Sequence, residues 1–285
     1  MPREVIDVHT HCFTSPKHTD RVREGLAAAM AEGLIRMVVV GLVNTKLDAE
    51  QMWGLIPRYV DNRGDPLFHE VDNLLTLARE HRPTLLPFVD TRHLWGGDVK
   101  TRLSDYMERG FRGLKGIYLA DDANDMKLQS VPEALGISLK AYHEREWEIF
   151  GYAETHHLPL VYHMDVQHYA DVASALLKDF PNVRVDFPHF GISRKGLGKL
   201  LDRYPNVFTD LASMLPYIRK SPKGYREFIL HYPEQVCFGS DAFLYEAETI
   251  VEYIRVVEEL ELPREVERLV LSQNPRRFLG KAFGD

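Results

Sequence analysis

Short apolar segments rich in β-branched residues alternate with longer amphipathic segments along the 285 residues of this chain, and this alternation predicts an α/β protein. About eight strand-like segments are present, which is the number that a single (β/α)8 TIM barrel requires. The length also fits, because such barrels typically need about 250 residues. We therefore predict one barrel domain over residues 1–285, with its active site at the C-terminal ends of the strands.

The expected strands share a core of Val, Ile, Leu or Phe and end at polar or turn residues. They are EVIDVH near residue 6, LIRMVVVGLV near 38, TLLPFVD near 87, FRGLKGIYL near 115, LPLVYH near 161, NVRVDFPH near 186, NVFTDLA near 209 and QVCFGSD near 238. The expected helices between them include VDNLLTLAREH, SLKAYHEREWEIFGYAETHH, DVASALLKDF and ETIVEYIRVVEEL. Two connections that follow strands, about 42–70 and 119–137, are unusually long. They either cover the active site and select the substrate or form surface loops without such a role.

Composition and charge narrow the classes of partner. Hydrophobic residues make up 45% and charged residues 27% of the chain, as in ordinary globular proteins. The net charge of -7, without a basic stripe, argues against nucleic acid, so we expect a small-molecule substrate. No segment approaches the ~20 apolar residues that span a bilayer, and we expect no membrane partner.

The N-terminal sequence and the cysteines favour a cytoplasmic protein. The segment MPREVIDVHTH contains no apolar signal region. Cys12 and Cys237 are too few for a disulfide framework and belong to no nucleophile signature, so we interpret both as small buried apolar residues.

His9 and His11 are the strongest chemical signal. One residue separates them on a predicted strand, so both side chains point to the same side, which in a barrel is the interior. Two buried imidazoles are costly without partners, and a divalent cation such as Zn²⁺ satisfies both. The alternative is a pair of hydrogen-bonded polar residues near the surface.

Three further polar residues favour the metal interpretation, because His163, His189 and Asp241 end the fifth, sixth and eighth predicted strands. In a barrel these ends converge on one face, so residues distant in sequence meet around one point. Four of the 13 histidines falling at strand ends, together with a carboxylate, is hard to ascribe to chance. We therefore predict a metal site.

The ordered motifs IDVHTH, GFRGLKGI, LVYH, PHFG, TDLAS, CFGSDAF and NPRRFLG extend over nearly the whole chain. This pattern resembles the amidohydrolase superfamily, and in particular the branch containing aminocarboxymuconate-semialdehyde decarboxylase and related metal-dependent hydrolases and lactonases. The resemblance implies that His9, His11, His163 and Asp241 hold the metal, and that His189 lies beside it and touches substrate or bound water. Relatives are often homodimers, although no interface can be read from this sequence.

Lys115 decides how many ions are expected. It occupies the strand-four position where binuclear members of the superfamily carry a carboxylated lysine bridging two metals. With a single ion, which is usual in the decarboxylase-like branch, Lys115 would instead neutralise a substrate carboxylate. We expect one ion rather than two, with Zn²⁺ ahead of Mn²⁺, although a mixed histidine and carboxylate site accepts either.

The remaining site residues receive catalytic or supporting roles. Asp241 would take the proton of the attacking water and deliver it to the leaving atom, while His189 would polarise the carbonyl or stabilise its oxyanion. The alternative for His189 is a satisfied core histidine. Asp7, on the inward side with His9, could hydrogen-bond a ligand histidine, and Asp210 is a weaker candidate for the same role. Arg92 and Arg194 follow strands three and six, and they either clamp a substrate carboxylate or are exposed loop residues.

Three functions are compatible with these residues. The first is hydrolysis of an amide, ester or lactone bond in a small, carboxylated or cyclic substrate by a metal-activated water. The second is non-oxidative decarboxylation of a small unsaturated or aromatic acid at the same site. Lys115 and the residues after His11 depart from what we expect of the best-known decarboxylases, so we place it second. The third is a non-catalytic barrel that binds metal or metabolite, and the complete ligand set argues against it.

Overall fold

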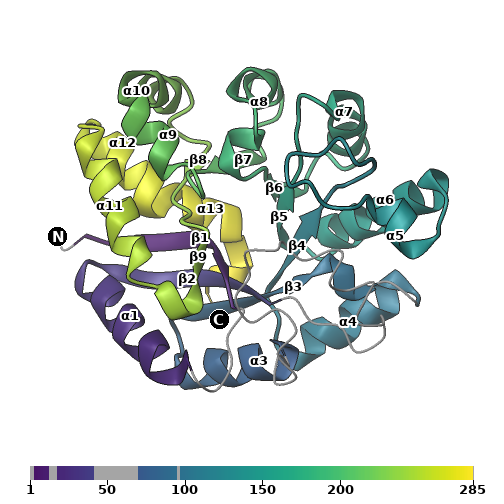
Figure 1. The fold of residues 1–285 in the computed structure, drawn as a ribbon, viewed down its shortest axis with the longest axis horizontal. Helices are drawn as coiled ribbons and strands as arrows, with labels where there is room; N and C mark the ends of the chain where they lie inside the picture. Colours follow the sequence, from purple (N-terminus) through teal and green to yellow (C-terminus); the bar gives the residue numbers. More distant parts are fainter. Residues whose placement is uncertain (1–2, 13–17, 42–69, 95–96, 285) are drawn as a thin grey trace.

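The computed structural model describes residues 3–12, 18–41, 70–94 and 97–284. In this part of the chain, nine parallel strands form one curled sheet in the order β8-β7-β6-β5-β4-β3-β2-β1-β9, with helices around its outside (Figure 1). The strands are β1 (Val5–His11), β2 (Leu34–Gly41), β3 (Leu85–Asp90), β4 (Gly113–Ile117), β5 (Pro159–His163), β6 (Arg184–Asp186), β7 (Val207–Asp210), β8 (Val236–Cys237) and β9 (Ala242–Phe243).

The segment from β8 to β9 closes the ring between β7 and β1. Its first part pairs with β7 and its last part with β1. Between them, the Val8 N–H donates to the Phe238 carbonyl at 3.0 Å, and the Asp241 N–H donates to the His9 carbonyl at 2.8 Å. The prediction of a TIM-barrel fold is confirmed. The eighth expected strand is split into β8 and β9, and Asp241 lies in the break.

The helices cover the outer face of the sheet, and several begin at side-chain caps that satisfy free backbone N–H groups. Asp98 accepts from the Thr101 N–H at 2.8 Å, and Ser138 from the Ala141 N–H at 3.1 Å. The helices are α1 (Thr19–Ala31), α3 (Glu70–Glu80), α4 (Val99–Arg109), α5 (Val131–Leu135), α6 (Leu139–Thr155), α7 (Ala170–Asp179), α8 (Arg194–Leu201), α9 (Leu215–Lys220), α10 (Pro222–His231), α11 (Thr249–Glu259), α12 (Arg264–Arg268) and α13 (Asn274–Leu279). Short helical turns include η2 (Thr91–Leu94) and η3 (His189–Gly191).

The buried apolar residues form two clusters, one inside the barrel and one in the layer between the strands and the helices. The inner cluster joins residues of six strands to Phe278 and Leu279 of α13. Its strand members are Ile6, Val8, Val38, Val40, Leu86, Phe88, Val161, Phe208 and Cys237. The outer cluster joins other strand residues, among them Met37, Val39, Leu114 and Leu160, to apolar residues of the helices. The two clusters lie on opposite faces of the sheet because neighbouring side chains alternate along a strand. Among the described residues, no helix has the length and apolar character needed to cross a lipid bilayer.

Candidate metal centre

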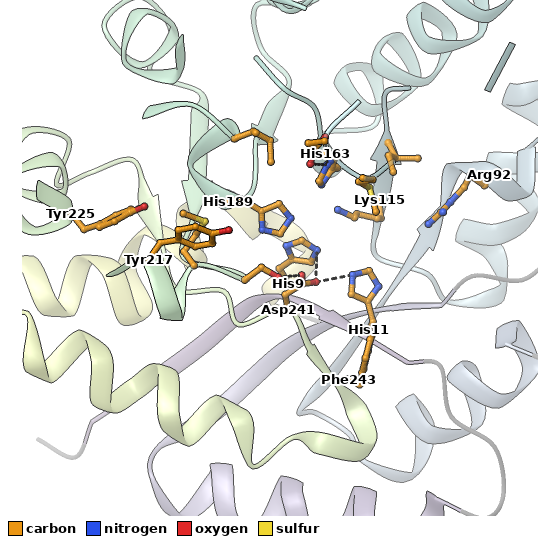
Figure 2. Close-up of a pocket in the computed structure, with 16 residues that line it drawn as sticks. His9, His11, Arg92, Lys115, His163, His189, Tyr217, Tyr225, Asp241 and Phe243 are labelled. Carbon is orange, nitrogen blue, oxygen red and sulfur yellow. Dashed lines mark hydrogen bonds and ion pairs between the residues drawn. The ribbon is translucent and has the colours of Figure 1, made fainter. Parts of the chain in front are cut away.

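A cavity of about 880 Å³ opens where the C-terminal ends of the strands converge. Polar side chains from β1, β4 and β5, and from the segments after β3, β6, β7 and β8, point into it (Figure 2). Its described lining residues are His9, His11, Arg92, Lys115, Ile117, Asp125, Met126, His163, His189, Ile192, Ser213, Met214, Tyr217, Tyr225, Asp241 and Phe243. This is the face at which enzymes with this fold carry their active sites.

His9, His11 and Asp241 form a tight polar cluster in the cavity. Nε2 of His11 lies 3.0 Å from Oδ1 of Asp241, and Nε2 of His9 lies 3.4 Å from the same oxygen (Figure 2). One candidate ligand atom from each residue lies within 4.8 Å of the other two. Three atoms at this spacing could hold a single divalent cation.

Asp210 fixes the orientation of the His9 ring. Its Oδ2 lies 3.0 Å from Nδ1 of His9, and its Oδ1 accepts the backbone N–H groups of His189 and Ala212 at 2.9 and 3.1 Å. A carboxylate only accepts, so Nδ1 carries the hydrogen and Nε2 presents a lone pair. This Nε2 is buried and has no hydrogen-bond partner among the described residues. An oriented imidazole whose second nitrogen makes no hydrogen bond and lies close to a carboxylate fits a metal ligand.

The protonation states of His9 and Asp241 also favour binding of a cation. Burial, together with the nearby Lys115, lowers the pKa of His9 well below its usual range. Burial alone would raise the pKa of Asp241, but the imidazoles of His9 and His11 outweigh it and hold that pKa well below its usual range. A neutral imidazole and an ionised carboxylate are the forms that bind divalent metals.

A bulge in β1 turns His9 and His11 into the cavity. Asp7 pairs with Met37 while Thr10 pairs with Val39, so β1 accommodates one extra residue between these pairs. Asp7 pairs with a residue of the outer cluster, lies between Ile6 and Val8 of the inner one, and does not line the cavity. The expectation that Asp7 shares the inward side with His9 is therefore wrong, because it assumed unbroken alternation.

Asp7 instead joins the backbones of β1 and the β8–β9 turn. Its Oδ1 accepts the backbone N–H groups of His9 at 3.0 Å and Ser240 at 3.2 Å, and its Oδ2 accepts the Ser240 hydroxyl at 2.6 Å. Burial raises the pKa of Asp7 to about 8. Asp7 thus positions the cluster through the main chain, and Asp210, the weaker candidate, is the carboxylate that contacts a histidine ring.

Backbone strain is concentrated beside the cluster. His189, Ser213 and Asp241 have φ angles of 58°, 55° and 60°, in the left-handed region that residues other than glycine rarely adopt. The Ser213 hydroxyl donates to Oδ2 of Asp241, whereas both histidine rings lie near Oδ1. Such strained backbone conformations persist only where surrounding contacts hold them in place, and they are common at functional sites.

His163 lies outside the tight cluster in this structure. Its Nε2 is 3.1 Å from Oδ2 of Asp125, and its ring meets the His189 ring edge-on with 5.1 Å between centroids. Burial raises the pKa of Asp125, but the contact with His163 outweighs it, and the result is a lowered pKa. Two groups of potential ligands occur among the described residues, His9 with His11 and Asp241, and His9 with His189 and Asp210, and neither includes His163. The role of His163 as a ligand stays a prediction.

His189 lies between His9 and His163, and its tautomer bears on its role. Its Nδ1 is 2.7 Å from the Ala212 carbonyl, which only accepts, so Nδ1 carries the hydrogen. Burial lowers the pKa of His189, which keeps the ring neutral and leaves a lone pair at Nε2. The expected oxyanion role needs a hydrogen at Nε2, so this tautomer favours proton acceptance instead.

The three candidate cations for substrate binding differ in their surroundings. Lys115 lines the cavity, is buried, and its amine has no hydrogen-bond partner among the residues that the structure describes. Burial lowers its pKa against the opposing charges of nearby aspartates. Arg92 also lines the cavity but holds Asp90 through two contacts, of 2.9 and 2.6 Å. Arg194 lies outside the lining and stacks over Tyr225 at 4.0 Å from the ring centroid.

A family model described as Amidohydrolase matches residues 6–281. The chain belongs to the amidohydrolase family. This confirms the resemblance inferred from the ordered motifs, since a match of this extent includes every strand that lines the cavity. Metal dependence is typical of this family, and the cluster of His9, His11 and Asp241 is compatible with it. No curated protein matches this amidohydrolase in sequence.

Solved structures with the same fold are distant in sequence. An uncharacterized TIM-barrel protein from Bordetella bronchiseptica is 14% identical, covers 99% of this chain and 100% of its own, and superposes with a TM-score of 0.65. A putative metal-dependent hydrolase from Lactobacillus casei is 10% identical over 98% of this chain and 96% of its own, with a TM-score of 0.55. A metallopeptidase described as dipeptidase AC is 11% identical over the whole of both chains, also with a TM-score of 0.55. At these identities the likeness concerns the fold alone.

Several cavity residues were not among the sequence candidates. Asp125 and Met126 come from the long connection after β4. This connection therefore lines the cavity, which agrees with the alternative in which it covers the site. The aspartates of DDANDMK, directly after a strand, were the available signal. Ser213 ends the TDLAS motif, whereas Tyr217 and Tyr225 had no signal at all. The other long connection lies outside the described residues.

Proposed function

We propose that this amidohydrolase is a metal-dependent hydrolase that cleaves an amide, ester or lactone bond in a small carboxylated substrate. One divalent cation, Zn²⁺ or Mn²⁺, would be held by His9, His11 and Asp241, with His163 as the fourth ligand. The observation that carries the proposal is the buried Nε2 of His9, which lacks a hydrogen-bond partner among the described residues and faces the other ligand atoms. Asp210 holds this ring in the tautomer that a metal requires.

The cation would supply Lewis acidity, polarising a substrate carbonyl and lowering the pKa of water beside it. Lys115 would hold the substrate carboxylate, because its buried amine faces the cavity without a hydrogen-bond partner among the described residues. In this proposal Asp241 and His189 move the proton. Asp241 is ionised and held by Ser213, and His189 presents the lone pair of Nε2.

Metal analysis and turnover test this proposal together. Protein purified without chelator should contain one Zn²⁺ or Mn²⁺ per chain, lose activity on N-acyl amino acids or lactones when chelated, and regain activity with added metal. His9→Asn should abolish metal binding. The matched control is His157→Asn, which replaces an exposed histidine at a φ of 55°, a conformation that asparagine tolerates.

Product mass separates this proposal from its main alternative. Hydrolysis adds the mass of water to the substrate, whereas decarboxylation removes the mass of carbon dioxide. Release of carbon dioxide from a small unsaturated or aromatic acid would reassign the reaction. Metal binding without turnover of the panel would instead favour a non-catalytic barrel.

A further inference from the structure

The cavity has two chemically different sides. In the ring of strands, β3 and β4 lie opposite β7 and β8. Lys115 belongs to β4 and Arg92 follows β3, whereas Tyr217 and Tyr225 lie on α9 and α10, which follow β7. Figure 2 shows the two cations on one side of the histidine cluster and the two tyrosines on the other. A molecule that spans the cluster therefore meets different chemistry at each end.

The tyrosine side is an apolar wall that solvent partly reaches. It contains Tyr217 and Tyr225 (Figure 2). Ile192 and Met214, which follow β6 and β7, add apolar lining from the neighbouring segments. Tyr217 is 59% exposed and Ile192 is 37% exposed, and both rank among the four exposed large hydrophobic residues found in the described part of the chain. Apolar area left in water at a cavity rim is favourably covered by an apolar ligand group.

Other side chains pack against Tyr225 and hold it in place. The guanidinium of Arg194 stacks over one face of Tyr225, 4.0 Å from the ring centroid. The Phe190 ring lies 5.2 Å from Tyr225, between centroids. Tyr217 takes part in no ring contact within the described residues, and more than half of its surface is exposed at the cavity, where a ligand can reach it. An apolar wall with one ring open to the cavity suits a ligand that carries a flat aromatic group, because the two rings can stack.

The opposite side suits an anion. The Lys115 amine is buried at the cavity without a hydrogen-bond partner among the described residues, and the Arg92 charge is matched by Asp90. Ile117 of β4 and Met126 of the connection after it also line the cavity, and the neighbouring carboxylate of Asp125 is paired with His163. Ile117 and Met126 carry no aromatic ring, and they would contact the carbon chain beside a carboxylate.

We propose that the substrate is an aromatic carboxylic acid derivative, whose ring lies on Tyr217 and whose carboxylate meets Lys115, with the bond to be cleaved over the histidine cluster. Tyr217 is then the specificity-determining residue of the aromatic subsite. This inference rests on the proposed function and deepens it, since it names the substrate class of the same site.

Equilibrium binding tests the subsite without requiring turnover. Calorimetry with the protein as purified should show that 3-phenylpropanoate binds about tenfold more tightly than butanoate, which lacks the ring. Tyr217→Ser should remove that advantage and leave butanoate affinity unchanged, and Tyr217→Phe should restore it. Lys115→Met should weaken both probes about equally.

The matched control is Leu139→Ser, because Leu139 is 48% exposed and lies on α6 outside the cavity lining. It should change neither affinity. Equal affinities of the wild-type protein for the two probes, or equal losses for both in Tyr217→Ser, would overturn the aromatic subsite. Selective binding in a protein that hydrolyses nothing would support the subsite and overturn the proposed function. Hydrolysis restricted to ringless substrates would overturn the subsite alone.

Discussion

Replacement of Asp210 by asparagine tests how the His9 ring is prepared for metal. The carboxylate lies 3.0 Å from Nδ1 of His9 and also accepts two backbone N–H groups. Asparagine can keep the backbone contacts through its carbonyl oxygen, but its amide nitrogen then faces Nδ1. This nitrogen only donates, so the imidazole must place its hydrogen on Nε2, where it blocks metal binding.

The expected effect follows from comparable partners of metal-binding histidines, whose loss lowers metal affinity about 10- to 100-fold. This corresponds to about 1.4 to 2.7 kcal/mol of binding free energy. Competition of the protein with a fluorescent zinc chelator measures the dissociation constant. The melting temperature of the metal-free variant should not fall, because the substitution removes a buried carboxylate whose pKa burial already raises.

Asp105→Asn is the control, since Asp105 is exposed on α4 and remote from the cavity. It should leave zinc affinity unchanged. Zinc binding by Asp210→Asn within twofold of the wild-type affinity, with an unaltered circular dichroism spectrum, would refute the role of Asp210 in setting the His9 tautomer. A parallel loss of affinity and melting temperature would point to general disruption instead.

Three further predictions concern the substrate, the proton and pH. Lys115→Met should raise KM for carboxylated substrates by at least about tenfold, with a smaller effect on kcat, because it removes a ground-state contact; steady-state kinetics on a carboxylated substrate and its amide check this. His189→Asn should lower kcat by about 10²- to 10⁴-fold while zinc content stays the same, since proton transfer contributes on this scale; equal kcat values would exclude His189 from the reaction. Burial raises the pKa of Glu146 to about 7, so the folded state binds an extra proton between about pH 4.5 and 7 and loses stability as pH rises through this window. Glu146→Gln should therefore flatten the decline in unfolding free energy between pH 5 and 8, by about 2 kcal/mol in chemical denaturation, and an unchanged decline would contradict the assignment.

The repeated elements of the barrel were predictable from the sequence. Strand cores rich in β-branched residues and helical periodicity depend on short stretches of chain, so eight strands were placed without tertiary information. The C-terminal ends of parallel strands in a barrel converge on one face, so the sequence alone predicts that His9, His11 and Asp241 lie close together.

Features that depend on irregular backbone or on loops were not predictable in this way. The bulge in β1 reverses the sides of Asp7 and His9, and strict alternation cannot anticipate an inserted residue. The contact between Asp125 and His163 depends on how a long connection folds back over β5. The aromatic wall was missed because Tyr217 and Tyr225 lie on helices after β7, where tyrosine is usually interpreted as packing.

The direct test of the metal centre is anomalous diffraction at the zinc edge from crystals grown with Zn²⁺. We expect one strong peak about 2.0 to 2.2 Å from Nε2 of His9, Nε2 of His11 and a carboxylate oxygen of Asp241. Well-ordered side chains without a peak between them, or a peak bound only by other residues, would contradict this expectation.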